Sequence, residues 1–167
     1  DIDKFKPLQK EKLFTKFNLK DSPFVLATFH PETIAIKKNI EYASSMSKAL
    51  EELSASINIV VTMPNADTLG SVFRHQLLKL KEKKPNNTFL VENFGKENYF
   101  SAMYYSRFLI GNTSSGIIEA ASFNKFVLNV GDRQKGRSQS KNTFNAIFTK
   151  NDILEKSFKI LNLSTFK

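Results

Sequence analysis

The sequence of 167 residues contains no cysteine, which excludes disulfide bonds and thiolate metal sites. No apolar run approaches the roughly 20 residues that a membrane-spanning helix needs, and the opening residues, DIDK, are not those of a signal peptide. Histidine is scarce, with two residues, and no group of His, Asp and Glu has metal-ligand spacing. Neither a P-loop nor a glycine-rich dinucleotide fingerprint is present. We therefore expect a cytoplasmic protein that uses no metal or other cofactor and does not contact membranes.

Positive charge, in contrast, is in excess: 25 Lys and Arg face 16 Asp and Glu, a formal net charge of +9. Such a balance is typical of proteins that bind nucleic acids, anionic membranes or phosphorylated small molecules. The lysines are spread along the chain, with one short cluster at 81–84, and aromatic residues do not alternate with basic ones as they do in single-strand binders. The sequence therefore disfavours a nucleic-acid partner and leaves a phosphorylated small molecule as the candidate ligand.

Short apolar runs alternate along the chain with segments of helical periodicity, and the length fits one domain with its own core. The expected strands are 24–29, 57–63, 88–91, 108–110, 126–130 and 145–148. The expected helices are 6–18 (with Pro7 in its first turn), 36–53, 70–83, 97–105, 114–123 and 152–161, and 131–142 is expected to be an ordered loop. In the second helix one face is shared by Ile36, Ile40, Ala43, Ser47, Leu50 and Leu53. The alternation predicts a doubly wound, mostly parallel α/β sheet of the Rossmann-like kind.

Small and polar residues follow the expected strands. Open parallel sheets bind ligands beyond the carboxyl ends of their strands, so these segments are the ones that matter for function. They read HPET at 30–33, PNAD at 64–67, NFG at 93–95, GNTSSG at 111–116 and GDRQKGR at 131–137. Because the carboxyl ends of parallel strands meet at one edge, we expect a ligand site there.

The segment 111–116 is the most informative, because it joins a strand directly to a helix through small residues. Small residues let a ligand approach the backbone closely, and the free N–H groups at a helix start favour a phosphate. The hydroxyls of Thr113, Ser114 and Ser115 would add hydrogen bonds. The simpler interpretation is that Thr113 or Ser114 caps the helix. The two interpretations are compatible, because capping and anion binding use the same groups.

Four other side chains have a functional and a structural interpretation. Glu119, on an otherwise apolar helix, would repel a phosphate but accept two hydrogen bonds from a ribose diol; alternatively the helix dipole simply favours it there. Arg133 and Arg137 suit a diphosphate or form a solvated basic loop. His30, at a strand end before a proline, suits a donor to phosphate or an acid, although a lone histidine is more often structural.

These segments together resemble the hydrolysing UDP-N-acetylglucosamine 2-epimerases. The similarity runs from about residue 24 to the C-terminus and rests on TFHPET at 28–33, PNAD at 64–67, GNTSSGIIEA at 111–120 and NVGDRQKGR at 129–137. That family has two Rossmann-like domains facing a cleft, the GT-B arrangement, and binds UDP mainly through the C-terminal one. The resemblance implies that residues 1–167 are this C-terminal UDP-binding domain, and that the N-terminal domain is absent from the chain.

The resemblance also implies roles for single residues. Ser114 with Thr113 contacts the diphosphate, Glu119 holds the ribose, and His30 approaches the diphosphate beside the reacting sugar as the catalytic residue. The implied UDP contacts are Asn65, Phe94, Thr113, Ser114, Ser115, Glu119, Arg133 and Arg137, with Asn65 and Phe94 around the uracil and ribose. In the family reaction UDP is eliminated from carbons 1 and 2 to give a glycal. Water then adds with inversion at carbon 2, releasing N-acetylmannosamine for sialic acid synthesis.

Two features favour the hydrolysing branch of the family. Non-hydrolysing relatives carry His-Arg-Arg-Glu after the first strand, and Asp-Ser-Gly-Gly with paired glutamates at the phosphate helix. This sequence has HPE at 30–32 and a single glutamate, Glu119. The family's proposed acid/base carboxylates lie in the N-terminal domain, so the chain is expected not to turn over substrate alone. Intact members often form homo-oligomers.

Three alternatives stay open at this point. The first is a hydrolysing epimerase of a UDP-2,4-diacetamido-trideoxyhexose, on the legionaminic acid route. A glycosyltransferase of GT-B architecture would need an acceptor and would release no free sugar without one. A non-catalytic UDP-binding module would bind the nucleotide and release nothing. Sugar-selecting contacts come largely from the other domain of the family, so the sequence does not separate these alternatives.

Overall fold

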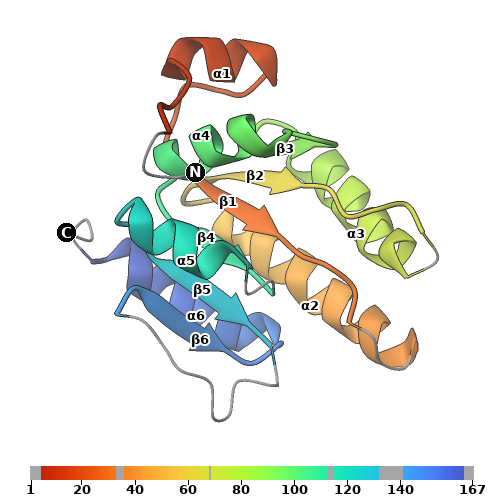
Figure 1. Cartoon of the computed structure of the whole chain (residues 1–167). Coiled ribbons are helices and arrows are strands. Elements are labelled where there is room, and N and C mark those ends of the chain that lie inside the picture. Colours follow the sequence, from red (N-terminus) through yellow and green to blue (C-terminus); the bar gives the residue numbers. More distant parts are fainter. Residues whose placement is uncertain (1–4, 33–35, 68, 113–114, 132–140, 164–167) are drawn as a thin grey trace.

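The computed structural model of the chain contains a six-stranded sheet covered by helices on both faces (Figure 1). It describes residues 5–32, 36–67, 69–112, 115–131 and 141–163. The strands are β1 (Phe24–Thr28), β2 (Asn58–Thr62), β3 (Thr88–Val91), β4 (Leu109–Gly111), β5 (Val127–Val130) and β6 (Thr143–Ala146). The helices are α1 (Lys10–Lys16), α2 (Ile36–Leu53), α3 (Gly70–Lys83), α4 (Lys96–Tyr105), α5 (Ser115–Ser122) and α6 (Lys150–Leu161).

The strand order is β3-β2-β1-β4-β5-β6, and all neighbouring strands run parallel. The chain therefore builds one half of the sheet outward from β1, then returns to the other side of β1 and builds the second half. The direction of winding reverses between β1 and β4, where Thr28 pairs with Gly111. Doubly wound sheets bind ligands at such a switch point. The predicted doubly wound, Rossmann-like fold is confirmed.

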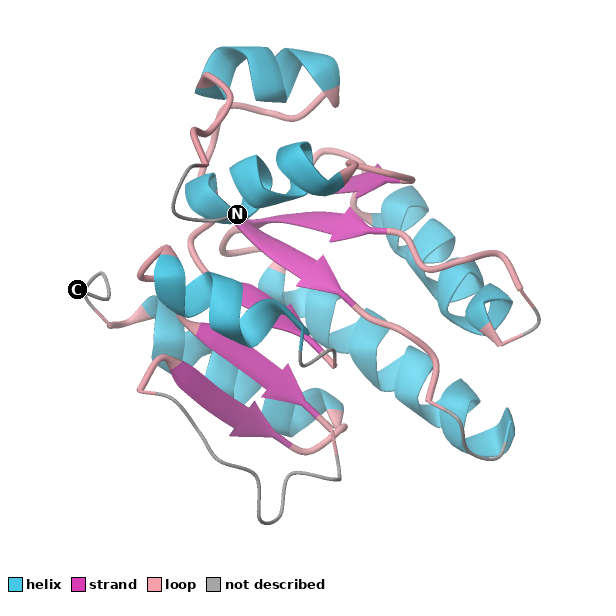
Figure 2. Ribbon diagram, viewed as in Figure 1, coloured by secondary structure: helices cyan, strands magenta, loops and turns pink. Residues whose placement is uncertain are grey.

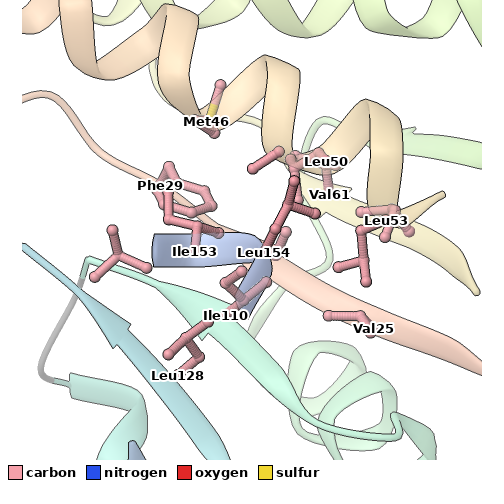
Figure 3. Close-up of a cluster of buried hydrophobic side chains, with 14 of the residues drawn as sticks. Val25, Phe29, Met46, Leu50, Leu53, Val61, Ile110, Leu128, Ile153 and Leu154 are labelled. Atoms are coloured by element: carbon pink, nitrogen blue, oxygen red, sulfur yellow. The ribbon is translucent and has the colours of Figure 1, made fainter. Parts of the chain in front are cut away.

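The two faces of the sheet carry separate apolar clusters. Helices α2, α3 and α6 cover one face, and α1, α4 and α5 lie over the other (Figure 2). Along β1, Val25 and Ala27 join the first cluster, whereas Phe24 and Leu26 join the second. In Figure 3, side chains of the sheet such as Val61 lie close to those of α2 such as Leu50. A strand buried on both faces reads as an unbroken apolar run, which explains the sequence FVLAT.

Two elements differ from the sequence-based expectation. The first helix begins at Lys10 instead of residue 6, and Pro7 lies outside it. The reason is a pair of long-range bonds at Leu8, whose N–H donates to Ser101 Oγ (3.0 Å) and whose carbonyl accepts from the Tyr105 hydroxyl (2.6 Å). The last strand spans 143–146 instead of 145–148, because this stretch pairs with β5.

The exposed start of α2 is a further difference. Ala43, Ser47, Leu50 and Leu53 are buried as their shared face predicts. Ile36 and Ile40 of the same face are 57% and 50% exposed. The first turn of α2 extends beyond the strand ends (Figure 1), so there is no sheet for these side chains to cover. The buried position in this turn belongs to a polar residue, Asn39, which is fully buried.

Candidate functional site

The candidate site begins where β1 and β4 end side by side. Gly111, the last residue of β4, allows the two strands to approach closely here. A Cβ atom added to it would lie 1.9 Å from the main-chain oxygen of Thr28, well inside van der Waals contact. The loop that follows β1 and the turn that follows β4 therefore start from the same point of the sheet.

Asn112, directly after β4, binds the main chain of His30 through both atoms of its side-chain amide. The His30 N–H donates to Asn112 Oδ1 (2.8 Å), and Asn112 Nδ2 donates to the His30 carbonyl (2.6 Å). The same Nδ2 lies 3.5 Å from Glu32 Oε2. Beyond the last pair of β1 and β4, Thr28 with Gly111, this amide joins the two segments again and fixes the main chain of His30.

A second amide holds the other end of the same loop. The Glu32 N–H donates to Asn39 Oδ1 (2.8 Å), and Asn39 Nδ2 donates to the Glu32 carbonyl (2.8 Å). Buried amides are generally satisfied in this way, and Asn39 thereby replaces an apolar core residue in α2. The loop after β1 is thus fixed at two points, at His30 by Asn112 and at Glu32 by Asn39.

The environment of His30 favours its neutral form. Although the residue is exposed, the protein around it removes part of its hydration, and this desolvation lowers the pKa of the imidazole below its ordinary value. A neutral imidazole at physiological pH is able to accept a proton as an anion approaches, because a nearby negative charge raises its pKa.

A chain of polar groups lies beneath this loop, on the α4 side of the sheet. Thr28 Oγ1 is 2.6 Å from Thr62 Oγ1 and 3.4 Å from the Tyr99 hydroxyl. Burial raises the pKa of Tyr99, and the charge of Glu119 adds to that rise. Glu119 Oε2 is itself buried, and the described part of the chain offers it no hydrogen-bond partner. Unsatisfied buried oxygens are uncommon and call for an explanation.

Arg74 connects the loops that follow β2 and β3. Its Nη1 and Nη2 atoms donate to the two carboxylate oxygens of Glu92 (2.9 and 2.7 Å), and Nη1 also donates to the Pro64 carbonyl (2.9 Å). These hydrogen bonds lower the pKa of Glu92. In the same loop Asp67 Oδ1 accepts the N–H of Gly70 (2.7 Å) at the start of α3. The loop that carries Asn65 is therefore held at both ends.

The site residues predicted from the sequence do not all lie at the candidate site. His30 and Glu119 flank the switch point, where α5 begins at Ser115, and Asn65 is exposed after β2. Phe94 is only 5% exposed, and its ring centroid lies 4.6 Å from that of Phe17, so its ring belongs to the core. Outside the described residues lie Thr113, Ser114, Arg133 and Arg137.

Asn112, Asn39 and Arg74 are missing from the sequence-derived set. Asn112 directly follows a strand at the switch point, and this position in the sequence could have identified it as a site residue. No local pattern indicates the other two. Among the described residues, no three His, Asp or Glu side chains come together as a metal site. None of the helices described here is long and apolar enough to cross a membrane.

The strand order and the polar switch point define a Rossmann-like α/β domain of the kind that forms one half of a GT-B protein. Among solved structures, the UDP-GlcNAc 2-epimerase of Methanocaldococcus jannaschii has this fold. The superposition covers 95% of this chain and 45% of the chain of that enzyme, with a TM-score of 0.71 at 13% sequence identity.

The sequence family can be assigned more narrowly. The family model described as UDP-N-acetylglucosamine 2-epimerase matches residues 1–166, and the chain belongs to this family. A curated relative, the GDP/UDP-N,N'-diacetylbacillosamine 2-epimerase (hydrolyzing) of Campylobacter jejuni, is 32% identical over 161 residues, covering 96% of this chain and 41% of the relative. The polysialic acid biosynthesis protein P7 of Escherichia coli is 30% identical over 145 residues, covering 87% of this chain and 37% of that relative. The chain thus spans about two-fifths of the length of these relatives.

Proposed function

We propose that this chain is the UDP-binding domain of a hydrolysing UDP-sugar 2-epimerase, which eliminates UDP and hydrates the resulting glycal to release a free 2-acetamido sugar. The observation that carries the proposal is the double hydrogen bond between Asn112 and the main chain of His30. It fixes the main chain that carries the His30 imidazole, two residues beyond the last pair of β1 and β4, and such preorganisation is what a nucleotide-sugar site requires.

In the proposed complex the diphosphate lies at the start of α5, bound by Thr113, Ser114 and Ser115. N–H groups and the helix dipole favour an anion there. The arginines of the loop after β5, Arg133 and Arg137, pair with the same diphosphate. The uracil lies toward Asn65 and the main chain of Phe94.

Glu119 accepts hydrogen bonds from the ribose diol in this proposal. Its buried oxygen lacks a hydrogen-bond partner in the described residues, and a hydroxyl donor would satisfy it. A carboxylate bound to a neutral hydroxyl makes a stronger hydrogen bond than two neutral groups do. The nearby Tyr99 and Thr28 place further hydroxyls on the same side of the sheet.

His30 acts on the leaving group. UDP departs with its electron pair, and negative charge develops on the oxygen that leaves carbon 1. An imidazolium beside the diphosphate stabilises that charge or donates its proton to it. Because the resemblance places the family's proposed acid/base carboxylates in the other domain, we expect no turnover by this chain alone. Sugar release by the purified chain would contradict this expectation.

UDP binding is expected to take up a proton at His30. The imidazole is neutral in the free protein because its pKa is lowered, and the bound diphosphate raises that pKa, so affinity for UDP should increase as pH falls from about 8 to about 6.5. Calorimetric titrations at neutral pH, in two buffers with different ionisation enthalpies, measure this proton uptake. His30→Asn should abolish it. Equal uptake by the variant would show that the proton binds elsewhere, for instance on UDP itself.

Glu119→Leu is expected to weaken UDP binding about tenfold without lowering stability. The substitution removes a buried carboxylate oxygen that has no partner in the described residues. An unsatisfied buried polar group costs about 1–3 kcal/mol of folding stability, and its removal should offset the loss of the native side chain. The decisive ligand is 2',3'-dideoxy-UDP, which lacks the ribose hydroxyls. The unmodified protein should prefer UDP to it by about tenfold, and the variant should bind both alike. An unchanged preference in the variant would remove Glu119 from the ribose site.

Two sugars are candidates for the substrate of the whole protein. The Campylobacter relative is named for diacetylbacillosamine, which favours a UDP-2,4-diacetamido-trideoxyhexose. The E. coli relative is named for polysialic acid biosynthesis, which favours UDP-N-acetylglucosamine. Incubating the full-length enzyme with each UDP-sugar and measuring the free sugar decides between them. Release of neither sugar, with UDP still bound, would favour a glycosyltransferase or a non-catalytic module.

A further inference from the structure

A second pocket lies at the opposite, amino-terminal edge of the sheet. It has a volume of about 260 Å³ and is lined by residues that precede β1, β4 and β5, and by the end of α6. Three of its side chains are cationic: Lys10, Arg107 and Lys125. A neighbouring hollow of about 290 Å³ shares the side chain of Arg107. The pocket is therefore separated from the candidate UDP site by the length of the strands.

Positive charge in this pocket is poorly balanced. Within the described residues, neither Arg107 nor Lys125 has a carboxylate at ion-pair distance, and Lys10 has one, Asp21 at 3.6 Å, on an exposed surface. Lys125 is partly buried. Burial lowers its pKa, and the charge of Arg107 lowers it further. The positive charges of Arg107 and Lys125 thus repel each other.

The main chain of both residues is fixed by hydrogen bonds, and the side chain of Arg107 makes one as well. The Arg107 N–H donates to the Phe24 carbonyl (2.7 Å), and its Nη2 donates to the Leu161 carbonyl (3.1 Å). The Lys125 N–H donates to the Ala120 carbonyl (2.8 Å). Just before it, Asn124 adopts a left-handed conformation with φ of 59°, which ends α5 and turns the chain into the pocket.

Helix dipoles offer a simpler reason for cations at this edge, since α4, α5 and α6 all end here. Carbonyl groups at a helix C-terminus attract cations, and the Arg107–Leu161 bond is a contact of that kind. The dipole explanation fits Arg107, whose side chain reaches the carbonyl of Leu161 at the end of α6. In the described part of the chain, the side chain of Lys125 makes no such hydrogen bond to a helix carbonyl.

We propose that this pocket binds a dianionic phosphate group, with Lys125 and Arg107 as its ion-pair partners. A dianion between them would offset their repulsion, and a guanidinium offers a planar pair of N–H donors that matches phosphate oxygens. The volume lies below the range of about 300–1,000 Å³ typical of pockets for drug-sized ligands. Orthophosphate or a small phosphomonoester therefore fits better than a nucleotide.

The test is a titration of the full chain with inorganic phosphate and, separately, with glycerol 3-phosphate, at constant ionic strength. Amide chemical shifts locate the binding, and calorimetry measures the affinity. We expect saturable shifts centred on Arg107 and Lys125, and at least tenfold weaker binding by Lys125→Gln. Tighter binding of one of the two ligands shows whether the pocket is suited to free phosphate or to a phosphomonoester. Saturating UDP should leave these shifts in place, which separates this pocket from the carboxyl edge.

Lys79→Gln is the matched control, because it removes the same charge from an exposed position of α3. If Lys79→Gln and Lys125→Gln weakened phosphate binding equally, the effect would come from the net charge of the protein alone, and the proposal would be overturned. Shifts confined to the carboxyl edge, or no saturation at all, would overturn it as well. Because Lys125 makes no side-chain hydrogen bond in the described structure, its replacement by glutamine should leave the fold intact.

Discussion

Replacing Gly111 by alanine is expected to lower the free energy of unfolding by more than about 3 kcal/mol. The new Cβ atom would lie 1.9 Å from the Thr28 oxygen and 2.9 Å from the Thr28 carbonyl carbon. Both are main-chain atoms, so relief requires β1 and β4 to separate at the switch point. Urea unfolding followed by circular dichroism measures the loss, and UDP binding should disappear with the pairing of His30 and Asn112.

Gly95→Ala is an informative comparison for this experiment. Gly95 has a φ of +74° and nothing within 4 Å of an added Cβ, so alanine there meets backbone strain but no clash. Its expected loss is about 1–2 kcal/mol. If the Gly111 variant proved as stable as the unmodified protein, the close approach of β1 and β4 would not be a requirement of the fold.

Asn112→Ala is expected to weaken UDP binding by about 10- to 100-fold, equivalent to about 1.4–2.8 kcal/mol. The substitution removes two hydrogen bonds to the main chain of His30, so the loop loses its fixed position and must be ordered again by the ligand. Calorimetry measures the affinity. A proton NMR titration of the His30 ring provides a second readout, because a freer ring is better hydrated and its pKa should rise toward the ordinary value.

A loss of stability alone must be distinguished from this positioning effect. Asn142→Ala removes a buried amide at the other edge of the sheet, where Nδ2 donates to the Lys125 carbonyl (2.9 Å). This control should lower stability at least as much as Asn112→Ala and leave UDP affinity unchanged. If both variants bound UDP equally well, Asn112 would be a structural residue only.

Much of the fold was predictable from local pattern. Strands such as FVLAT in β1 are apolar on both faces because both faces are covered, and the helices between them show the expected periodicity, so a parallel doubly wound sheet followed. The start of the first helix was predicted too early, because the main chain of Leu8 bonds to Ser101 and Tyr105, more than 90 residues away. No window of sequence contains that information.

For the candidate site, the small and polar residues after the strands already indicated a ligand at the carboxyl edge, because parallel strands must all end there. Composition and periodicity also established the α/β class, since each residue's neighbours in sequence are enough to reveal a buried strand or an amphipathic helix. The fixing of His30 by Asn112 is different, because those residues are 82 positions apart and meet through the register of β1 with β4. The burial of Asn39 and the crowding of Lys125 by Arg107 likewise depend on which helix ends pack together, a property of the assembled sheet that no local pattern contains.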